Sequence, residues 1–178
     1  MVEVLEKEIA KNTRAISLHI QSDAVVAEKV KHLTAIKGVG ELSVAIVLAE
    51  TNGFALFDSI AQVVSYAGYD VVENQSGKHV GKTKISKKGN SHIRRSLHMP
   101  ALSVVRWKVK PFLLLYERTY ARHGIKMKSY VAVQKKLLAL MYTLWKKNEA
   151  FNENYTSNPA TADEEAVQPS RHSLAEAE

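Results

Sequence analysis

The chain has 178 residues, of which 46% are hydrophobic, and it contains no cysteine. This length suits one domain with appendages, and the missing cysteines exclude a disulfide framework and a thiolate metal site. The formal net charge is +7, but residues 151–178 hold six acidic residues and one basic residue, which leaves +12 on residues 1–150. No signal peptide opens the chain and no run of about 18 apolar residues could span a bilayer, so we expect a soluble, cytoplasmic protein with no membrane partner.

The first predicted element is an amphipathic helix. Apolar residues recur every three or four positions, the period of one helical face, at Val2, Leu5, Ile9, Ile16 and Ile20. We expect residues 1–21 to form a coiled-coil-like helix through which the chain assembles as a homo-oligomer.

A helical domain is predicted over residues 22–150, beginning with a glycine turn between two helices. Ser22 or Asp23 can cap a helix that ends near Thr34, and Glu41 begins another helix. The order helix, glycine turn, helix is typical of a helix-hairpin-helix. In such a motif we expect Gly38 and Gly40 to adopt conformations barred to other residues, and the first amides of the second helix to bind a phosphate. The alternative is a plain helical corner without a ligand.

The remaining elements are mostly helical, so the fold class is mainly α. A helix from residue 58 or 59 to about 67 precedes an irregular basic loop over residues 69–88 that can hold one short hairpin. A helix over residues 90–107 should be kinked or split by Pro100. Two further helices are predicted over residues 111–123 and 129–147, and residues 151–178 read as a disordered acidic tail.

The charge pattern indicates a nucleic-acid partner. Residues 75–147 contain eighteen Lys or Arg and a single carboxylate, Glu117. A merely solvated face usually mixes both signs, whereas cations without acids neutralise phosphates and release their counterions. The candidate nucleic-acid-binding cations are Lys78, Lys82, Lys84, Lys87, Lys88, Arg94 and Arg95.

Ser76 is the candidate for chemistry. A serine beside glycine is most often a turn former, but neighbouring cations would activate it if the loop folds back. Three histidines are possible proton carriers: His79, His92 and His98. Residues 75–116 contain no Asp or Glu, so this stretch cannot by itself supply the carboxylates of a two-metal nuclease, and we assign no metal ligand.

An ordered series of motifs gives these features a family resemblance. The series runs through Leu33 to Gly40, Phe57, Ser65-Tyr66-Ala67-Gly68, Gln75-Ser76-Gly77 and Ile85 to Ala101. Over about residues 30–147 it resembles the C-terminal domain of the IS-one-ten family of insertion-sequence transposases.

The resemblance implies a DNA recombinase that acts in transposition. It implies that Ser76 is the nucleophile that joins covalently to DNA, and that a structured guide RNA is a partner. It further implies an N-terminal RuvC-like domain with four carboxylates, for which a divalent metal (Mg) is expected. This chain lacks that domain and starts within what looks like the linking coiled coil, so we expect little or no strand transfer from it alone.

Two alternatives remain open on the residues alone. The chain could be a non-catalytic helix-hairpin-helix module that binds DNA while Ser76 caps a turn. It could also be a structural fragment whose first helix dimerises and whose affinity for nucleic acid is incidental.

Overall fold

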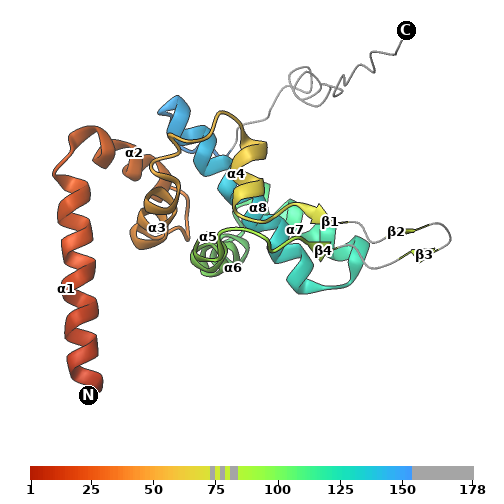
Figure 1. Ribbon diagram of the computed structural model, residues 1–178, viewed down its shortest axis with the longest axis horizontal. Helices are drawn as coiled ribbons and strands as arrows, with labels where there is room; N and C mark the ends of the chain where they lie inside the picture. Colours follow the sequence, from red (N-terminus) through yellow and green to blue (C-terminus); the bar gives the residue numbers. More distant parts are fainter. Residues whose placement is uncertain (73–74, 77–78, 81–83, 154–178) are drawn as a thin grey trace, which may run out of the picture.

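The computed structural model describes residues 1–72, 75–76, 79–80 and 84–153, and its fold is mainly helical (Figure 1). Lys78, Lys82 and the predicted acidic tail beyond residue 153 lie outside the described residues. In the described part, no helix is long and apolar enough to cross a membrane.

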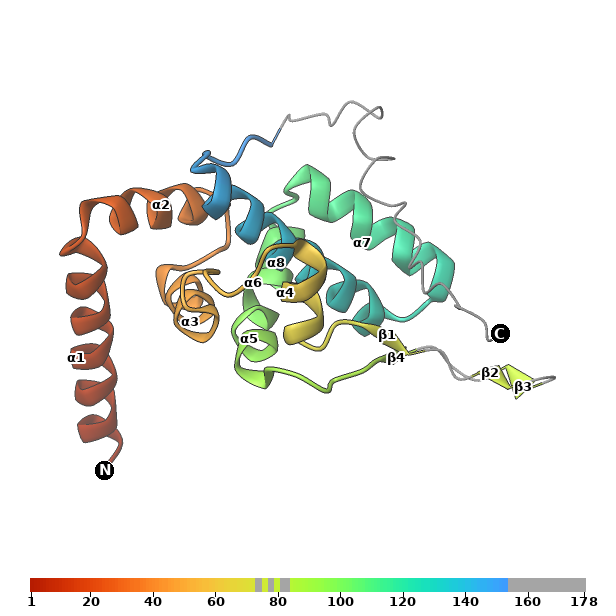
Figure 2. The ribbon, with the colours of Figure 1, turned by 45° about the horizontal axis from the view of Figure 1, so that its top comes forward.

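The amino-terminal helix α1 (Val2–Gln21) extends away from the other helices, as both ribbon views show (Figures 1 and 2). Its apolar stripe has two environments. Ile20 is buried and Ile16 is packed against the core, whereas Val2, Leu5 and Ile9 are exposed. The predicted helix is therefore confirmed, and a coiled coil stays a prediction for its exposed half.

Helix α2 (Ala24–Thr34) begins at Asp23. The Asp23 carboxylate accepts hydrogen bonds from the amides of Val25 at 2.9 Å and Val26 at 3.1 Å. Two otherwise unpaired donors of the first turn are thereby satisfied. Of the two predicted caps, Asp23 is the one used.

Of the two glycines between α2 and α3 (Glu41–Thr51), only one occupies a position where the backbone conformation and the packing require glycine. Gly38 has φ +96°, and a Cβ there would lie 2.7 Å from the Cβ of Ser103. Gly40 has φ −87° and ψ 153°, an extended conformation open to any residue, and a Cβ there would meet nothing within 4 Å. The expectation that Gly40 needs a glycine-only conformation is therefore wrong, whereas that for Gly38 is confirmed.

A hairpin arm follows α4 (Ile60–Tyr66). Strands β1 (Val71–Val72) and β4 (Lys84–Ile85) pair antiparallel at its base, and β2 (Gln75–Ser76) and β3 (His79–Val80) pair antiparallel further out. Figure 2 shows β2 and β3 well away from the helices. The expected short hairpin is present, with two separate ladders.

The predicted break at Pro100 is confirmed. Helix α5 (Ser91–Ser96) ends, Leu97 intervenes, and α6 (His98–Arg106) begins with Pro100 in its first turn. In a continuous helix Pro100 would have no N–H for the carbonyl of Ser96, and its ring would crowd that carbonyl. The chain therefore divides into two short helices at this point.

Two helices complete the fold. Helix α7 (Lys110–His123) has Pro111 in its first turn and ends at Gly124, whose φ is +67°. Helix α8 (Lys126–Lys147) begins three residues before the predicted Ser129, because its first turn is exposed and leaves no apolar pattern in the sequence.

The core forms around α8, which packs against α2, α4, α6 and α7. Its apolar face is buried with large side chains from the other helices and loops, including Leu33, Val44, Phe54, Tyr69, Ile93, Leu97 and Phe112. Burial of this apolar surface is the main favourable term in folding, and it holds the hairpin arm and α5 on one side of the domain.

The two turn glycines should respond differently to alanine. Gly38→Ala should lower the free energy of unfolding by about 2–4 kcal/mol, because the new methyl group collides with Ser103 in a backbone region unfavourable for alanine. Gly40→Ala is the matched control and should change it by less than about 0.5 kcal/mol. Urea denaturation followed by circular dichroism measures both values. Equal losses in the two variants would contradict the assignment.

Candidate nucleic-acid interface

Residues 66–70 and 86–90 lie in direct backbone contact at Gly68 and Gly89, and we call this contact the crossing. The amide of Asn90 donates to the carbonyl of Tyr66 at 2.8 Å, and the amide of Lys87 donates to the carbonyl of Gly68 at 3.2 Å. A Cβ on Gly89 would collide with the carbonyl oxygen of Tyr66 and lie 2.7 Å from the amide nitrogen of Gly68. Only glycine permits this approach at Gly89, so the crossing fixes where the hairpin arm leaves the domain.

Asn90 connects the crossing to two helices. Its side-chain oxygen accepts from the amides of His92 at 2.9 Å and Ile93 at 3.1 Å, which caps α5. Its amide nitrogen donates to the Glu50 carboxylate on α3 at 2.6 Å. A hydrogen bond to a charged acceptor is among the stronger ones, so Asn90 ties the start of α5 to α3.

Arg94 holds the crossing together from the other side. Its Nη1 donates to the carbonyls of Ala67 at 2.8 Å, Gly89 at 3.1 Å and Asn90 at 3.3 Å. Sequence reasoning treated Arg94 and Arg95 alike, as phosphate-binding cations. The structure gives Arg94 a role in the fold, whereas the Arg95 side chain is exposed.

The exposed cations next to the crossing are not compensated. The charged groups of Lys84, Lys87, Lys88 and Arg95 form no salt bridge or hydrogen bond with any described residue. Lys87 also has φ +55°, a left-handed conformation that is uncommon outside glycine, asparagine and aspartate. Unpaired cations on one surface produce a positive potential that attracts an anionic partner.

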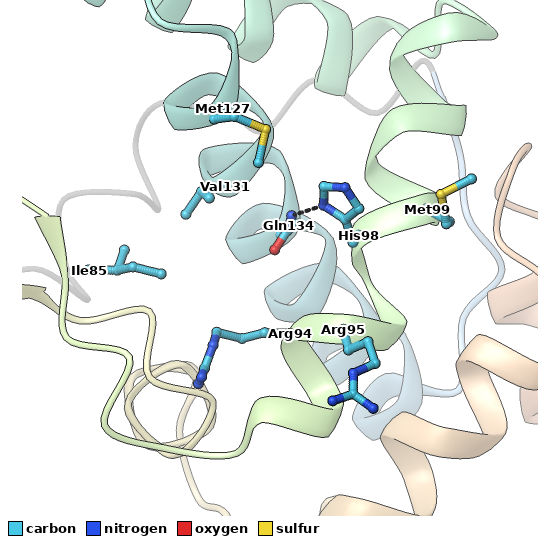
Figure 3. A pocket seen from close by; sticks show the side chains of 8 residues that line it. All are labelled: Ile85, Arg94, Arg95, His98, Met99, Met127, Val131 and Gln134. Carbon is cyan, nitrogen blue, oxygen red and sulfur yellow. Dashed lines mark hydrogen bonds between the residues drawn. The ribbon is translucent and has the colours of Figure 1, made fainter.

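A shallow open pocket lies beside these cations (Figure 3), between β4, α5, α6 and α8, with a volume of about 440 Å³. Its lining residues are Ile85, Arg94, Arg95, His98, Met99, Met127, Val131 and Gln134. No carboxylate is among them.

A polar chain runs from the core to this pocket. The buried Tyr69 hydroxyl donates to Oε1 of Gln134 at 3.0 Å, and Nε2 of Gln134 lies 3.2 Å from Nδ1 of His98. Burial raises the pKa of Tyr69 well above its ordinary value, and the positive charge of Arg94 opposes this shift in part. Tyr69 is therefore a neutral donor that fixes the orientation of the Gln134 amide.

Ser76 lies on the outer ladder of the hairpin arm. The strand register pairs Ser76 with His79 and Gln75 with Val80. Of the three possible proton carriers, His92 and His98 belong to α5 and α6, so His79 is the histidine that the register brings to Ser76.

A carboxylate lies at the glycine turn before α3, where the sequence predicts an anion site. Glu41 is the first residue of α3, and its carboxylate lies 3.4 Å from the Ser17 hydroxyl of α1. A carboxylate at a helix amino terminus already interacts with the positive end of the helix dipole and repels a phosphate. Both glycines are exposed, but a Cβ on Gly38 would collide with Ser103 of α6, whereas a Cβ on Gly40 would meet nothing within 4 Å.

Within residues 1–72, 75–76, 79–80 and 84–153 there is no group of three or more His, Asp or Glu side chains that could hold a metal ion.

The crossing, the hairpin arm and the exposed cations all lie within a segment that has known relatives. Residues 30–117 match the sequence model described as "Transposase IS116/IS110/IS902 family". The match covers 88 of the 178 residues, and over this stretch the chain is similar to that transposase family. The family expected from the motif series is thereby confirmed at this level.

Three relatives of this transposase-family domain are similar in sequence. A "Pilin gene-inverting protein" of Moraxella bovis is 27% identical over 121 residues, which are 67% of this chain and 38% of the relative. Its namesake in Moraxella lacunata matches to the same extent. A "Probable family 20 transposase" of Pseudomonas aeruginosa is 29% identical over 105 residues, which are 59% of this chain and 30% of the relative. The chain therefore spans well under half the length of these curated relatives.

Several residues of the candidate site could not be predicted from the sequence. Asn90 before a helix was a visible capping signal, but its bond to Glu50 joins residues 40 positions apart. Gln134 and Met127 belong to α8, and nothing in their local pattern places them beside α5. Contacts of this kind depend on how the helices pack.

Substitution of the two adjacent arginines should have different effects, with Arg94 affecting the stability of the fold and Arg95 the binding of DNA. Arg94→Ala should lower the free energy of unfolding by about 2 kcal/mol, because three carbonyls lose a charged donor. Arg95→Ala should change it by less than about 0.5 kcal/mol, and should reduce the salt slope of duplex DNA binding by about 0.9 if Arg95 contacts one phosphate. Chemical denaturation and fluorescence anisotropy at several salt concentrations measure these effects. Similar stability losses in both variants would refute the distinction.

Proposed function

We propose that this chain is the DNA-binding, serine-bearing part of a transposase or DNA recombinase. The observation that carries the proposal is the transposase-family domain over residues 30–117. The names of the relatives agree in kind, since one is named a probable transposase and another a gene-inverting protein. Transposition and gene inversion both require DNA strands to be cut and rejoined.

DNA binds, in this proposal, along the hairpin arm and α5. The exposed Lys84, Lys87, Lys88 and Arg95 neutralise phosphates there, and Lys78 and Lys82 extend the same run of cations in the sequence. Gly38 and Gly40 contribute a further backbone contact, which the carboxylate of Glu41 weakens. Such contacts position the DNA without reading its sequence.

Ser76 performs the covalent step. Its hydroxyl oxygen attacks a DNA phosphorus, a serine–phosphate ester forms, and the bond from phosphorus to one bridging sugar oxygen breaks. His79, opposite in register, accepts the serine proton, and the departing sugar oxygen is protonated to a free hydroxyl. The phosphoserine ester keeps the bond energy that later rejoins the strand.

The proposed activity has further components. A RuvC-like domain with a divalent metal and a structured guide RNA are the partners that we infer from the family. The chain alone should therefore bind DNA without forming strand-transfer products.

The nucleophile is tested in a protein that joins this chain to a candidate acid-bearing amino-terminal domain, supplied with the DNA and RNA of its element. We expect a covalent protein–DNA adduct on a denaturing gel that Ser76→Ala abolishes, because no other group replaces the attacking oxygen. Ser65→Ala, an exposed serine on α4, is the control and should retain the adduct. An adduct that survives Ser76→Ala would place the nucleophile elsewhere. DNA binding without any adduct would instead favour a non-catalytic module.

We also propose that α1 assembles two or more copies of the chain. Val2, Leu5 and Ile9 form an exposed apolar stripe on one helical face, and no described residue covers it. A second copy of α1 offers the same stripe, as a coiled coil requires.

Charge substitution in this stripe should dissociate the assembly. Leu5→Asp combined with Ile9→Asp should lower the mass in sedimentation equilibrium to that of one chain, because burying carboxylates in an apolar interface is unfavourable. Lys7→Asp, on the opposite face of α1, is the control and should leave the mass unchanged. A monomeric parent chain, or an oligomer that resists both aspartates, would exclude this interface.

A further inference from the structure

We propose that the pocket between β4, α5, α6 and α8 binds one unstacked nucleobase of the nucleic acid held at this surface. This inference rests on the proposed function and deepens it, because it assigns a ligand to a pocket beside the hairpin arm (Figure 3). The pocket is hereafter the base pocket, lined by the eight residues given above.

The shape of the base pocket suits a flat ring with a charged backbone attached. A volume of about 440 Å³ is within the range of small-molecule sites. The pocket is open to the surface, so a base can enter while its sugar and phosphate remain outside. Arg95 lies at the edge of the pocket, where its exposed guanidinium can pair with that phosphate.

The walls of the base pocket are apolar and uncovered. Met99 is 65% exposed and Met127 is 55% exposed, although both lie against a hollow that also contains Ile85 and Val131. Single exposed apolar residues are normal, but two exposed methionines beside two half-buried aliphatic residues, from three elements around one hollow, form an apolar surface with room for a ligand. Methionine adapts its shape to a ring, and its sulfur makes favourable contacts with aromatic systems.

The pocket also offers donors that can read the edge of a base. Gln134 is only 4% exposed, and its amide accepts from Tyr69 and donates one hydrogen to His98. Since Nδ1 of His98 accepts that hydrogen, the neutral imidazole carries its own proton on Nε2. Neither that Nε2 nor the second amide hydrogen of Gln134 has a partner among the described residues. Both can therefore donate to a ligand in the pocket, and every nucleobase edge presents acceptors.

The base pocket lies close to Ser76 along the chain. Ile85 in the pocket wall pairs with Val71 at the base of the hairpin arm, and Ser76 is five residues beyond Val71. Five residues span at most about 17 Å, which corresponds to about five stacked nucleotides. The bound base therefore belongs to a nucleotide near the phosphate that Ser76 attacks. Extrusion of a base is easiest where the strand is already unpaired.

The test uses the whole chain and two DNA duplexes that differ in one group. One duplex has a single unpaired base, and the other has an abasic nucleotide at the same position. Fluorescence anisotropy measures both affinities at several salt concentrations. We expect at least about 5-fold tighter binding of the duplex with the base, the lower end of what stacking of one base contributes.

Matched variants test whether the preference for the duplex with the unpaired base arises in the base pocket. Met99→Ala with Met127→Ala should reduce the ratio of the two affinities to about one, with unchanged salt dependence, because the walls are lost and the cations remain. Leu114→Ala with Leu56→Ala is the control, since these side chains are 65% and 73% exposed and lie outside the base pocket. The control should keep the ratio of the parent chain.

The possible results separate this inference from the proposed function. Equal affinity for both duplexes with a steep salt slope would overturn the base pocket while DNA binding stands. A preference for the base that survives loss of Met99 and Met127 would overturn it as well, since the base would then bind elsewhere. A failure to bind either duplex with salt-dependent affinity would contradict the proposed function itself.

Discussion

The structure depends on the backbone crossing at Gly68 and Gly89, which connects α4, the hairpin arm and α5. One segment of the crossing follows α4 and leads into the hairpin arm, and the other segment leaves the arm and leads into α5. Because Gly89 cannot carry a side chain, the two strands approach closely enough for Asn90 to bond the carbonyl of Tyr66. Asn90 then caps α5 and Arg94 closes the crossing through three carbonyls. Arg95 is left exposed as a consequence.

The scarcity of acids in the second half of the chain has a structural counterpart at this crossing. Glu50 of α3 is the carboxylate that contacts it, and its Oε2 accepts the bond from the side chain of Asn90 rather than one from a lysine. The neighbouring cations therefore keep their full charge toward solvent. Repulsion among them is tolerated because the helical core, centred on α8, supplies the favourable burial. The surface therefore has an uncompensated positive charge in the absence of any ligand.

Most helices could be predicted from the sequence because their signals are local. Apolar periodicity, the Asp23 cap, the Gly124 stop and the split at Pro100 each act within a few residues. The sequence was misleading where the same residue type can serve two different structural roles. Gly38 and Gly40 look alike in the chain, but only Gly38 contacts Ser103, and Arg94 differs from Arg95 only through its distant carbonyl partners. The base pocket could not be predicted because α8, which contributes Gln134, joins it through tertiary packing. The proposal of Ser76 as the nucleophile rests on the resemblance to a transposase family, since periodicity and charge alone would have left it as a turn residue.

The apolar stripe of α1 runs along both its packed half and its exposed half, so this helix fixes the position of the exposed half relative to the domain. Ile16 and Ile20 fix the carboxyl half of α1 on the domain, while Val2, Leu5 and Ile9 present the same face further along one rigid rod. An α-helix advances about 1.5 Å and turns about 100° per residue, so both the spacing and the direction of the free half are set by the number of residues between the two sets. Changes in the length of α1 over evolution should therefore come in steps of about seven residues, which return the stripe to the same side.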